Sequence, residues 1–322
     1  MAKREKKETF RTSIGGQALI EGILMRGPEK QAIVVRAPEG LVTKVEELKL
    51  VRDKYPILGL PIIRGVVTFL DSMVKGIKAL MFSASFLPED EEEPEEPSRF
   101  ELWLDRRLGS EKAASFFVTA AVALGIIFAV VLFILLPTAI TGLIGLVVPL
   151  PMWLRNLLEG VVKVVIFVGY LILCSRMKDI HRVFQYHGAE HKTIFCYEHG
   201  LPLTVENVRI QPRHHPRCGT SFLFVVIVVS ILLSSLLFSF IEVTNTFARM
   251  GLHLLLLPVI VSLTYEFNRL VGRYDNWFTR IMTAPGLWLQ NFTTFEPDDS
   301  MIQVGITALE LVLPEVKGED AW

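Results

Sequence analysis

Two long runs of residues without any charge constrain this chain more than any other feature. The first run, Phe116 to Leu136, holds 21 residues, and the second, Thr220 to Ile241, holds 22. A helix needs about 20 predominantly apolar residues to cross a bilayer. Each run is therefore predicted to form a membrane-spanning helix.

Two weaker apolar segments accompany them. Trp153 to Cys174 contains Glu159 and Lys163, spaced as an i, i+4 ion pair, and Gly251 to Val271 also carries a few polar groups. The chain as a whole is 51% hydrophobic, with a mean hydropathy of +0.43. We therefore expect an α-helical integral membrane protein with about four transmembrane helices, over residues 100–298, and the bilayer lipids as its surroundings.

The lysines and arginines predict the orientation of these helices, because cytoplasmic loops are rich in them. The central segment, residues 176–219, contains seven, whereas the loops after the first and third spans contain Arg155 and Arg249. Both termini are expected in the cytoplasm of a bacterium, with the spans in its inner membrane. The charged start of the chain, followed by no apolar stretch, argues against a signal peptide.

The residues outside the spans fall into several parts. Residues 1–12 are expected to be flexible, and residues 13–60 to form a small β-rich cytoplasmic part with strands at Gln31–Ala37 and Leu41–Glu47. Residues 61–87 have an apolar face interrupted by charges, which is typical of a helix in the membrane interface. Residues 88–99 form an acidic linker and residues 299–322 a C-terminal tail.

The segment from Tyr186 to Lys192 contains the order His-x-x-Glu-His. On a helix, His187 and His191 lie one turn apart on one face, with Glu190 beside them. Two imidazoles at this spacing can hold one divalent metal, most simply zinc. The same order occurs in inverted zincins, which are hydrolases. A polar helix with two surface histidines is the alternative.

Two further segments bring possible metal ligands to the same membrane level as this motif. His215 and Cys218 precede the third span, and Glu266 lies near the cytoplasmic end of the fourth. The third ligand is expected to be Glu266, Glu190, Cys218 or a histidine of the pair His214 and His215. If Glu190 is not a ligand, it can act as the base that activates water, and Arg269 or Lys192 can stabilise an anionic intermediate. Structural roles remain open: an ion pair for Glu266 and Arg269, and a buried thiol for Cys218.

Three motifs together resemble the YqhQ family of uncharacterised bacterial membrane proteins. They are Gly-Gly-Gln-Ala-Leu-Ile-Glu-Gly-Ile-Leu-Met-Arg-Gly at 15–27, Tyr-His-Gly-Ala-Glu-His-Lys at 186–192 and His-Pro-Arg-Cys-Gly-Thr-Ser-Phe at 215–222. The resemblance extends from about residue 13 to past residue 290. It implies a metal-dependent enzyme, a description that rests on the histidine motif, and it implies no substrate. The acidic linker and the residues after Asp298 fall outside it.

These observations lead to three functional hypotheses. The first is a zinc-dependent hydrolase at the cytoplasmic face of the membrane. The second is a scaffold or assembly partner for other membrane proteins, or for further copies of itself, with a structural metal. The third is a transporter component with Glu159, Lys163 and Glu266 along its path. The net charge of −1 argues against nucleic-acid binding, and three cysteines do not make a disulfide framework.

Overall fold

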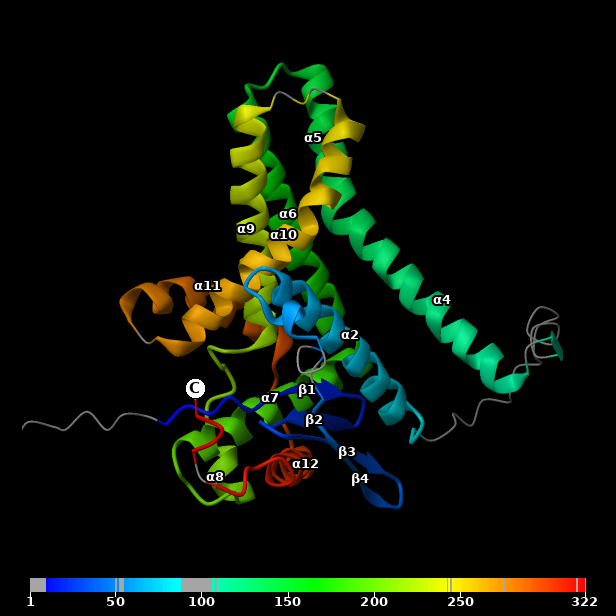
Figure 1. The fold of residues 1–322 in the computed structure, drawn as a ribbon, viewed down its shortest axis with the longest axis vertical. Coiled ribbons are helices and arrows are strands. Elements are labelled where there is room, and N and C mark those ends of the chain that lie inside the picture. Colours follow the sequence, from blue (N-terminus) through cyan, green and yellow to red (C-terminus); the bar gives the residue numbers. More distant parts are fainter. Residues whose placement is uncertain are drawn as a thin grey trace, which may run out of the picture. The chain divides into compact units, whose positions relative to one another are not determined.

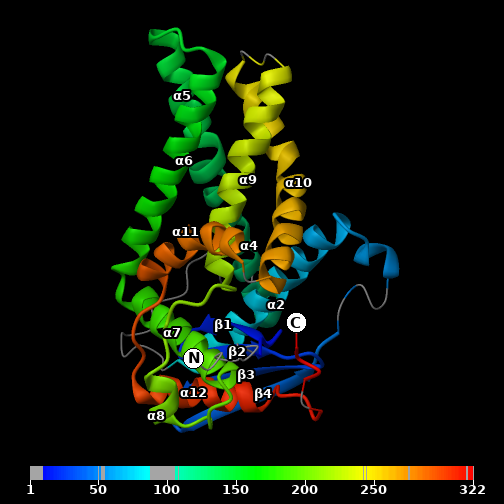
Figure 2. The same ribbon diagram turned by 90° about the vertical axis from the view of Figure 1, so that its left-hand side faces the viewer.

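The fold was analysed in a computed structural model that describes residues 10–49, 51, 55–87, 106–107, 109–241, 243, 245–274, 276–316 and 318–321. The predicted acidic linker and most of the predicted flexible N-terminus lie outside these residues. The chain divides into two compact units, one of residues 1–87, 168–230 and 257–322, and the other of residues 88–167 and 231–256. Figures 1 and 2 show the elements of both units.

The first unit contains a four-stranded antiparallel sheet in the order β1-β2-β3-β4. The strands are β1 (Gly15–Leu19), β2 (Gly22–Arg26), β3 (Lys30–Ala37) and β4 (Gly40–Glu47). The hairpin expected between the last two is confirmed, with Ala37 paired to Gly40 across a two-residue turn. The prediction of a small N-terminal sheet is therefore correct.

Both faces of the sheet are covered, because apolar residues alternate along β2 and β3. One face packs against α7 (Lys178–Glu198) and α12 (Asp299–Glu310), through residues such as Met25 and Val34. The other face packs against Ala79, Phe82 and Phe86 of α2 (Ile63–Ala84) and its C-terminal extension. The short η1 (Pro56–Gly59) precedes α2, and α8 (Val205–Arg209) contacts α7 and α12.

The C-terminal residues are not the tail that the sequence predicts. α12 begins with a cap, in which the Asp298 side chain accepts a hydrogen bond from the backbone N–H of Met301. Met301, Val304 and Leu309 are buried in the same core as the sheet. The reason is physical: the alternating strands leave an apolar face that needs a second helix beside α7 to cover it.

Four helical segments are long and apolar enough to cross a membrane: Phe116–Val147, Met152–Ser175, Gly219–Phe240 and Thr246–Val271. The last three match the predicted spans closely, as α6 (Met152–Ser175), α9 (Gly219–Phe240) and α10 (Thr246–Arg273). α11 (Trp277–Thr293) follows α10 and has no counterpart among the predicted elements.

The first candidate span extends beyond the uncharged run, from Phe116 to Val147. α4 (Ser110–Val130) continues through a π-helical turn, Val131–Leu135, into α5 (Leu136–Val147). The backbone N–H of Leu136 bonds to the carbonyl of Val131, five residues earlier. A π-helical turn changes the backbone hydrogen-bond pattern from four residues to five. Here the change falls just before Pro137, which has no N–H to donate.

The second unit contains a buried ion network centred on Glu159. Its carboxylate lies 3.2 Å from Nζ of Lys163, so the predicted i, i+4 pair is confirmed. It also lies 2.9 Å from Nε of Arg249 and 2.6 Å from Nε2 of His253, and it accepts a hydrogen bond from Thr138. The carboxylate of Glu159 therefore interacts with donor groups from three helices.

Candidate metal centre

α7 presents the His-x-x-Glu-His motif on the side that faces β1 and the turn before α9. The rings of His187 and His191 lie one turn apart, with their centroids separated by 4.4 Å. Gly188 allows this helix to pack closely, because a Cβ atom there would lie 2.0 Å from the carbonyl oxygen of Phe295. The motif is therefore held against the chain segment that follows α11.

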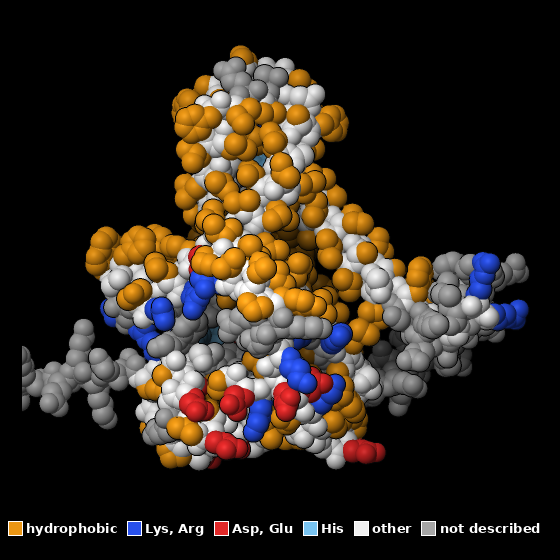
Figure 3. All heavy atoms as spheres, in the orientation of Figure 1, with side chains coloured by type: hydrophobic (Ala, Val, Ile, Leu, Met, Phe, Trp, Pro, Cys, Tyr) orange, Lys and Arg blue, Asp and Glu red, His pale blue; other side chains and the backbone are white. Residues whose placement is uncertain are grey.

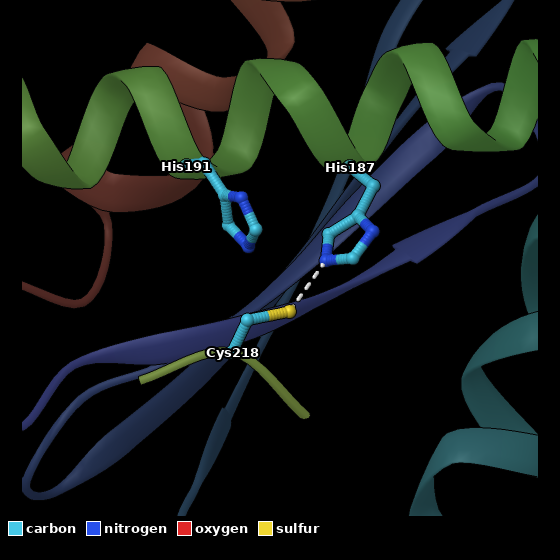
Figure 4. Close-up of side chains that lie close together, drawn as sticks. All are labelled: His187, His191 and Cys218. Atoms are coloured by element: carbon cyan, nitrogen blue, oxygen red, sulfur yellow. Dashed lines mark hydrogen bonds between the residues drawn. The ribbon is translucent and has the colours of Figure 1, made fainter. Parts of the chain in front are cut away.

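Cys218 completes a group of three donor atoms (Figure 4). Its Sγ lies 3.1 Å from Nε2 of His187, and the ligand atoms of His187, His191 and Cys218 all lie within 4.8 Å of one another. Donor atoms around a tetrahedral zinc ion are about 3.5 Å apart, given its bond lengths to nitrogen and sulfur. Small side-chain rotations would bring all three atoms to that separation.

Backbone carbonyls fix the tautomers of both histidines. Nδ1 of His187 lies 2.8 Å from the oxygen of Thr293, and Nδ1 of His191 lies 2.6 Å from the oxygen of Arg213. A carbonyl oxygen only accepts, so each Nδ1 carries the proton and each neutral ring offers Nε2 to a metal. This arrangement behind the ligand is usual for metal-binding histidines.

In the metal-free site the electrostatics favour a thiolate at Cys218 paired with a protonated His187, whose Nε2 becomes free for a metal once that proton has left. Burial would raise the pKa of Cys218, but the imidazoles of His187 and His191 lower it well below its ordinary value. Burial would lower the pKa of His187, but the neighbouring Cys218 raises it to about 9. The thiolate is the form of cysteine that binds metals.

Glu190 lies beside these donors with one oxygen unused. Its Oε1 accepts a hydrogen bond of 3.0 Å from the backbone N–H of Gly16, whereas the buried Oε2 has no hydrogen-bond partner among the described residues. Burial raises the pKa of Glu190, against the lowering effect of His187 and His191. A buried oxygen without a partner is costly, and a cation or a water molecule at the site would satisfy it.

A cavity of about 370 Å³ connects these groups. It is lined by β1 and the residues before it, by α7, and by the turn that leads into α9. Gly16 brings the strand close, since a Cβ there would lie 2.6 Å from the Leu24 carbonyl oxygen and 3.0 Å from Cδ of Glu190. The cavity leaves room for a small group next to the three donor atoms.

His215 lines the cavity but lies outside the donor group. Its ring centroid is 5.5 Å from that of His191, and its Nε2 points to Glu198, 3.7 Å away. Burial lowers the pKa of His215 to about 4. The structure therefore gives His215 a packing role beside the ligands, in place of the predicted ligand role.

Three other predicted site residues are placed elsewhere. Glu266 is not among the cavity-lining residues, because the guanidinium of Arg64 binds its carboxylate, with Nε 2.6 Å from Oε1. Arg269, the other suggested partner of Glu266, does not line the cavity either. Lys192 is buried outside the cavity lining, with Nζ 2.9 Å from the carbonyl oxygen of Arg209 and 2.7 Å from Glu296.

Sequence reasoning missed the residues behind the ligands. The side chain of Gln290 makes two hydrogen bonds with the backbone of His215, of 2.7 and 2.8 Å. Thr293 contributes only its backbone carbonyl and Gly16 only its backbone N–H. Their side chains therefore give no indication in the sequence that these residues support the site. Gln290 stands in a polar position of an amphipathic pattern, which on its own indicates solvent exposure.

The chain was compared with known proteins. The family model described as "Protein of unknown function (DUF1385)" matches residues 60–315. The "Uncharacterized protein YqhQ" of Bacillus subtilis (strain 168) is 31% identical over 310 residues, which cover 93% of this chain and 92% of that protein. No solved structure matches the chain.

These matches confirm the resemblance drawn from the three motifs. The matched region extends to residue 315, so the expectation that the resemblance stops at Asp298 is wrong. α12, which lies in that region, is part of the core that holds α7. The chain belongs to the DUF1385 family and is a relative of the YqhQ protein of Bacillus subtilis.

Proposed function

We propose that this protein is a multi-pass membrane hydrolase that depends on a divalent metal, and that the metal is zinc. The observation that carries the proposal is the group of three donor atoms, His187 Nε2, His191 Nε2 and Cys218 Sγ, beside a cavity. Three protein ligands with an adjoining space are typical of catalytic zinc sites, whereas structural sites have four ligands.

The ligand types support zinc. Imidazole nitrogen and thiolate sulfur are its usual donors, and both histidines present Nε2 because their Nδ1 atoms bind carbonyls. A zinc ion supplies Lewis acidity and lowers the pKa of water, so that water can attack at neutral pH.

Glu190 is proposed as the general base. Gly16 holds its Oε1, which leaves Oε2 to take a proton from a water molecule in the cavity. Glu190 would then pass this proton to the leaving group as the scissile bond breaks. Arg269 and Lys192 have no part in this proposal, because neither lines the cavity.

The location of the site supports a substrate that lies at the membrane. Cys218 directly precedes α9, one of the four apolar helices. The lysines and arginines of residues 176–219 favour the cytoplasmic side of a bacterial inner membrane. A lipid or a membrane-bound peptide is the substrate that this position favours.

A structural metal in a membrane scaffold is the second candidate, and one observation favours it. The free Oε2 of Glu190 could serve as a fourth ligand, which would close the site. The two candidate functions give Glu190 different roles. As a general base it is not needed to hold the metal, whereas as a fourth ligand it is.

Metal analysis of the purified protein and of matched variants tests both. We expect about one zinc per chain in the wild type, in Glu190→Gln and in the control His199→Ala, and its loss in His191→Ala. His199 is bonded to Gln211 and does not line the cavity. Loss of zinc in Glu190→Gln would favour the closed structural site, and a wild type that binds no metal would refute both functions.

An activity screen completes the test. Fluorogenic lipid esters and peptides are offered to the zinc-loaded protein in detergent micelles. Hydrolysis should fall by at least about 100-fold in Glu190→Gln if this residue is the base. Equal rates in the two proteins would refute the role of Glu190.

A further inference from the structure

α11 buries its polar side and exposes its apolar side. Trp277, Ile281 and Trp288 follow one another at helical spacing along one face and are 74%, 55% and 51% exposed. The opposite face carries Thr279, Gly286, Gln290 and Thr293, all of which are buried. A helix surrounded by water shows the reverse arrangement.

The polar face is buried for a structural reason. Gln290 binds the backbone of His215 and lies 3.2 Å from Oγ of Ser221. Gly286 lets the helix approach Ser221, since a Cβ there would lie 2.5 Å from that oxygen. The contacts that hold α11 therefore use its polar and small residues, and the tryptophans are left outside. Figure 3 shows hydrophobic side chains over this helix.

The contacts also fix where α11 lies. Ser221 is in the first turn of α9, and Trp277 follows the end of α10 by a few residues. α9 and α10 are consecutive candidate spans, so the start of one and the end of the other belong to the same membrane surface. α11 contacts the first turn of α9 and follows α10 closely along the chain, and hence lies at that surface.

α2 repeats the same inverted pattern. Its buried positions are small, Gly65, Gly76, Ala79 and Ser83. Its exposed stripe contains Ile63, Leu70, Val74 and Met81. The helix is attached to α10 at Ser262 and Glu266, which lie within a candidate span. Two independent helices thus place apolar stripes at the same end of the spans.

We infer that the face of α11 formed by Trp277, Ile281 and Trp288 docks into the lipid headgroup and upper acyl region. The occupant is lipid because the face continues from the ends of two candidate spans. Tryptophan is also the residue that prefers this zone of a bilayer. The inference rests on the proposed membrane insertion but is independent of the metal and of hydrolysis. It deepens the proposed function by anchoring the helix that supports His187 and His215.

Fluorescence quenching in proteoliposomes of phosphatidylcholine tests the inference. The chain has five tryptophans, so one variant keeps only Trp277 and another only Trp288, with phenylalanine at the other positions. The matched control carries Ile210→Trp in a tryptophan-free chain. Ile210 is an equally exposed apolar residue that follows α8, which lies away from α11 in both views (Figures 1 and 2).

We expect lipids brominated in the upper acyl chain to quench Trp277 and Trp288 at least about twofold more than the tryptophan at position 210. Iodide in the buffer should show the opposite order. If bromolipids quench all three equally, or if iodide reaches the α11 tryptophans, the inference is wrong. Blue-shifted emission without quenching by either agent would also overturn it, since another protein or a second copy would then cover the face.

A separate step distinguishes this failure from failure of membrane insertion. The vesicles are washed with alkaline carbonate before the measurement, which removes proteins that do not span the bilayer. Loss of the chain at this step would refute the membrane location of the proposed function. Retention of the chain without quenching would refute only the placement of α11.

Discussion

The carbonyl oxygen of Thr293 lies 2.8 Å from Nδ1 of His187, so the last residue of α11 fixes the orientation of the first proposed metal ligand. The contact joins residues 106 positions apart in the sequence. Anything that moves α11 relative to α7 must therefore change how His187 presents its Nε2 atom.

Gly286→Ala should weaken metal binding from a distance. The added Cβ would lie 2.8 Å from Cα of Ser221, so α11 must shift and carry Thr293 with it. Loss of such a supporting hydrogen bond typically lowers metal affinity by about 10- to 100-fold. Zinc affinity is measured by competition with a chelating dye. Gly169→Ala, where a Cβ would meet nothing within 4 Å, should bind zinc like the wild type.

Glu266→Gln should leave zinc binding unchanged. Glu266 is bound by Arg64 and does not line the cavity, so the variant removes an ion pair and no ligand. Because both side chains are partly exposed, the loss of stability should be no more than about 1 kcal/mol. Zinc content and thermal unfolding of the detergent-solubilised protein measure the two effects. A variant that unfolds like the wild type but lacks zinc would restore Glu266 as a ligand.

Arg249→Met should destabilise the protein strongly. Arg249 is buried, donates to Glu159 and lies over the ring of Phe238 at 3.9 Å. Removing one partner of a buried ion pair costs about 3–5 kcal/mol, and because Lys163 and His253 still lie beside Glu159, the loss here should be at the lower end of that range. Thermal unfolding in detergent measures the loss.

Two comparisons show whether the buried network is the cause. Arg209→Met breaks a solvent-exposed pair with Asp299 and should cost less than about 1 kcal/mol. The double variant Arg249→Met, Glu159→Gln should lose less stability than the sum of the two single variants, because both substitutions remove the same ion pair. If Arg249→Met and Arg209→Met are equally stable, the network does not support the fold.

His215→Gln should make the metal-free protein less sensitive to acid. Burial lowers the pKa of His215 to about 4, whereas an unfolded chain binds this proton near pH 6.5. The stabilising effect of the neutral ring is therefore complete above about pH 6.5 and is lost as the pH falls towards 4.

Unfolding temperatures between pH 7 and pH 4.5, in the presence of a chelator, measure this effect. The wild type should lose more stability over this range than His215→Gln, by up to roughly 3 kcal/mol. His199→Gln replaces an exposed histidine and should follow the wild type. A parallel decline of all three proteins would contradict the prediction.

The sequence was informative wherever a structural signal is local. Uncharged runs predict the candidate spans, and alternation predicts β3 and β4, because both patterns follow from the geometry of one element. The π-turn before Pro137 has no such pattern, so the sequence did not indicate it. The sequence did not predict α12, because this helix covers a sheet face whose strands lie about 270 residues earlier in the sequence.

The site follows the same rule. His187, Glu190 and His191 share one helical face, so their proximity is a local property. Glu266 could not be judged in this way, because its partner Arg64 lies 202 residues away. The role of Gln290 could not be predicted either, because its side chain makes two hydrogen bonds with the backbone of His215.

The hydrogen bond between Gly16 and Glu190 has a consequence for the order of assembly. Gly16 is synthesised before the histidines, and Thr293 is synthesised after them. The contacts that support the proposed metal site are therefore incomplete until Thr293 has been made, so a growing chain would acquire an ion there only after α11 has emerged from the ribosome.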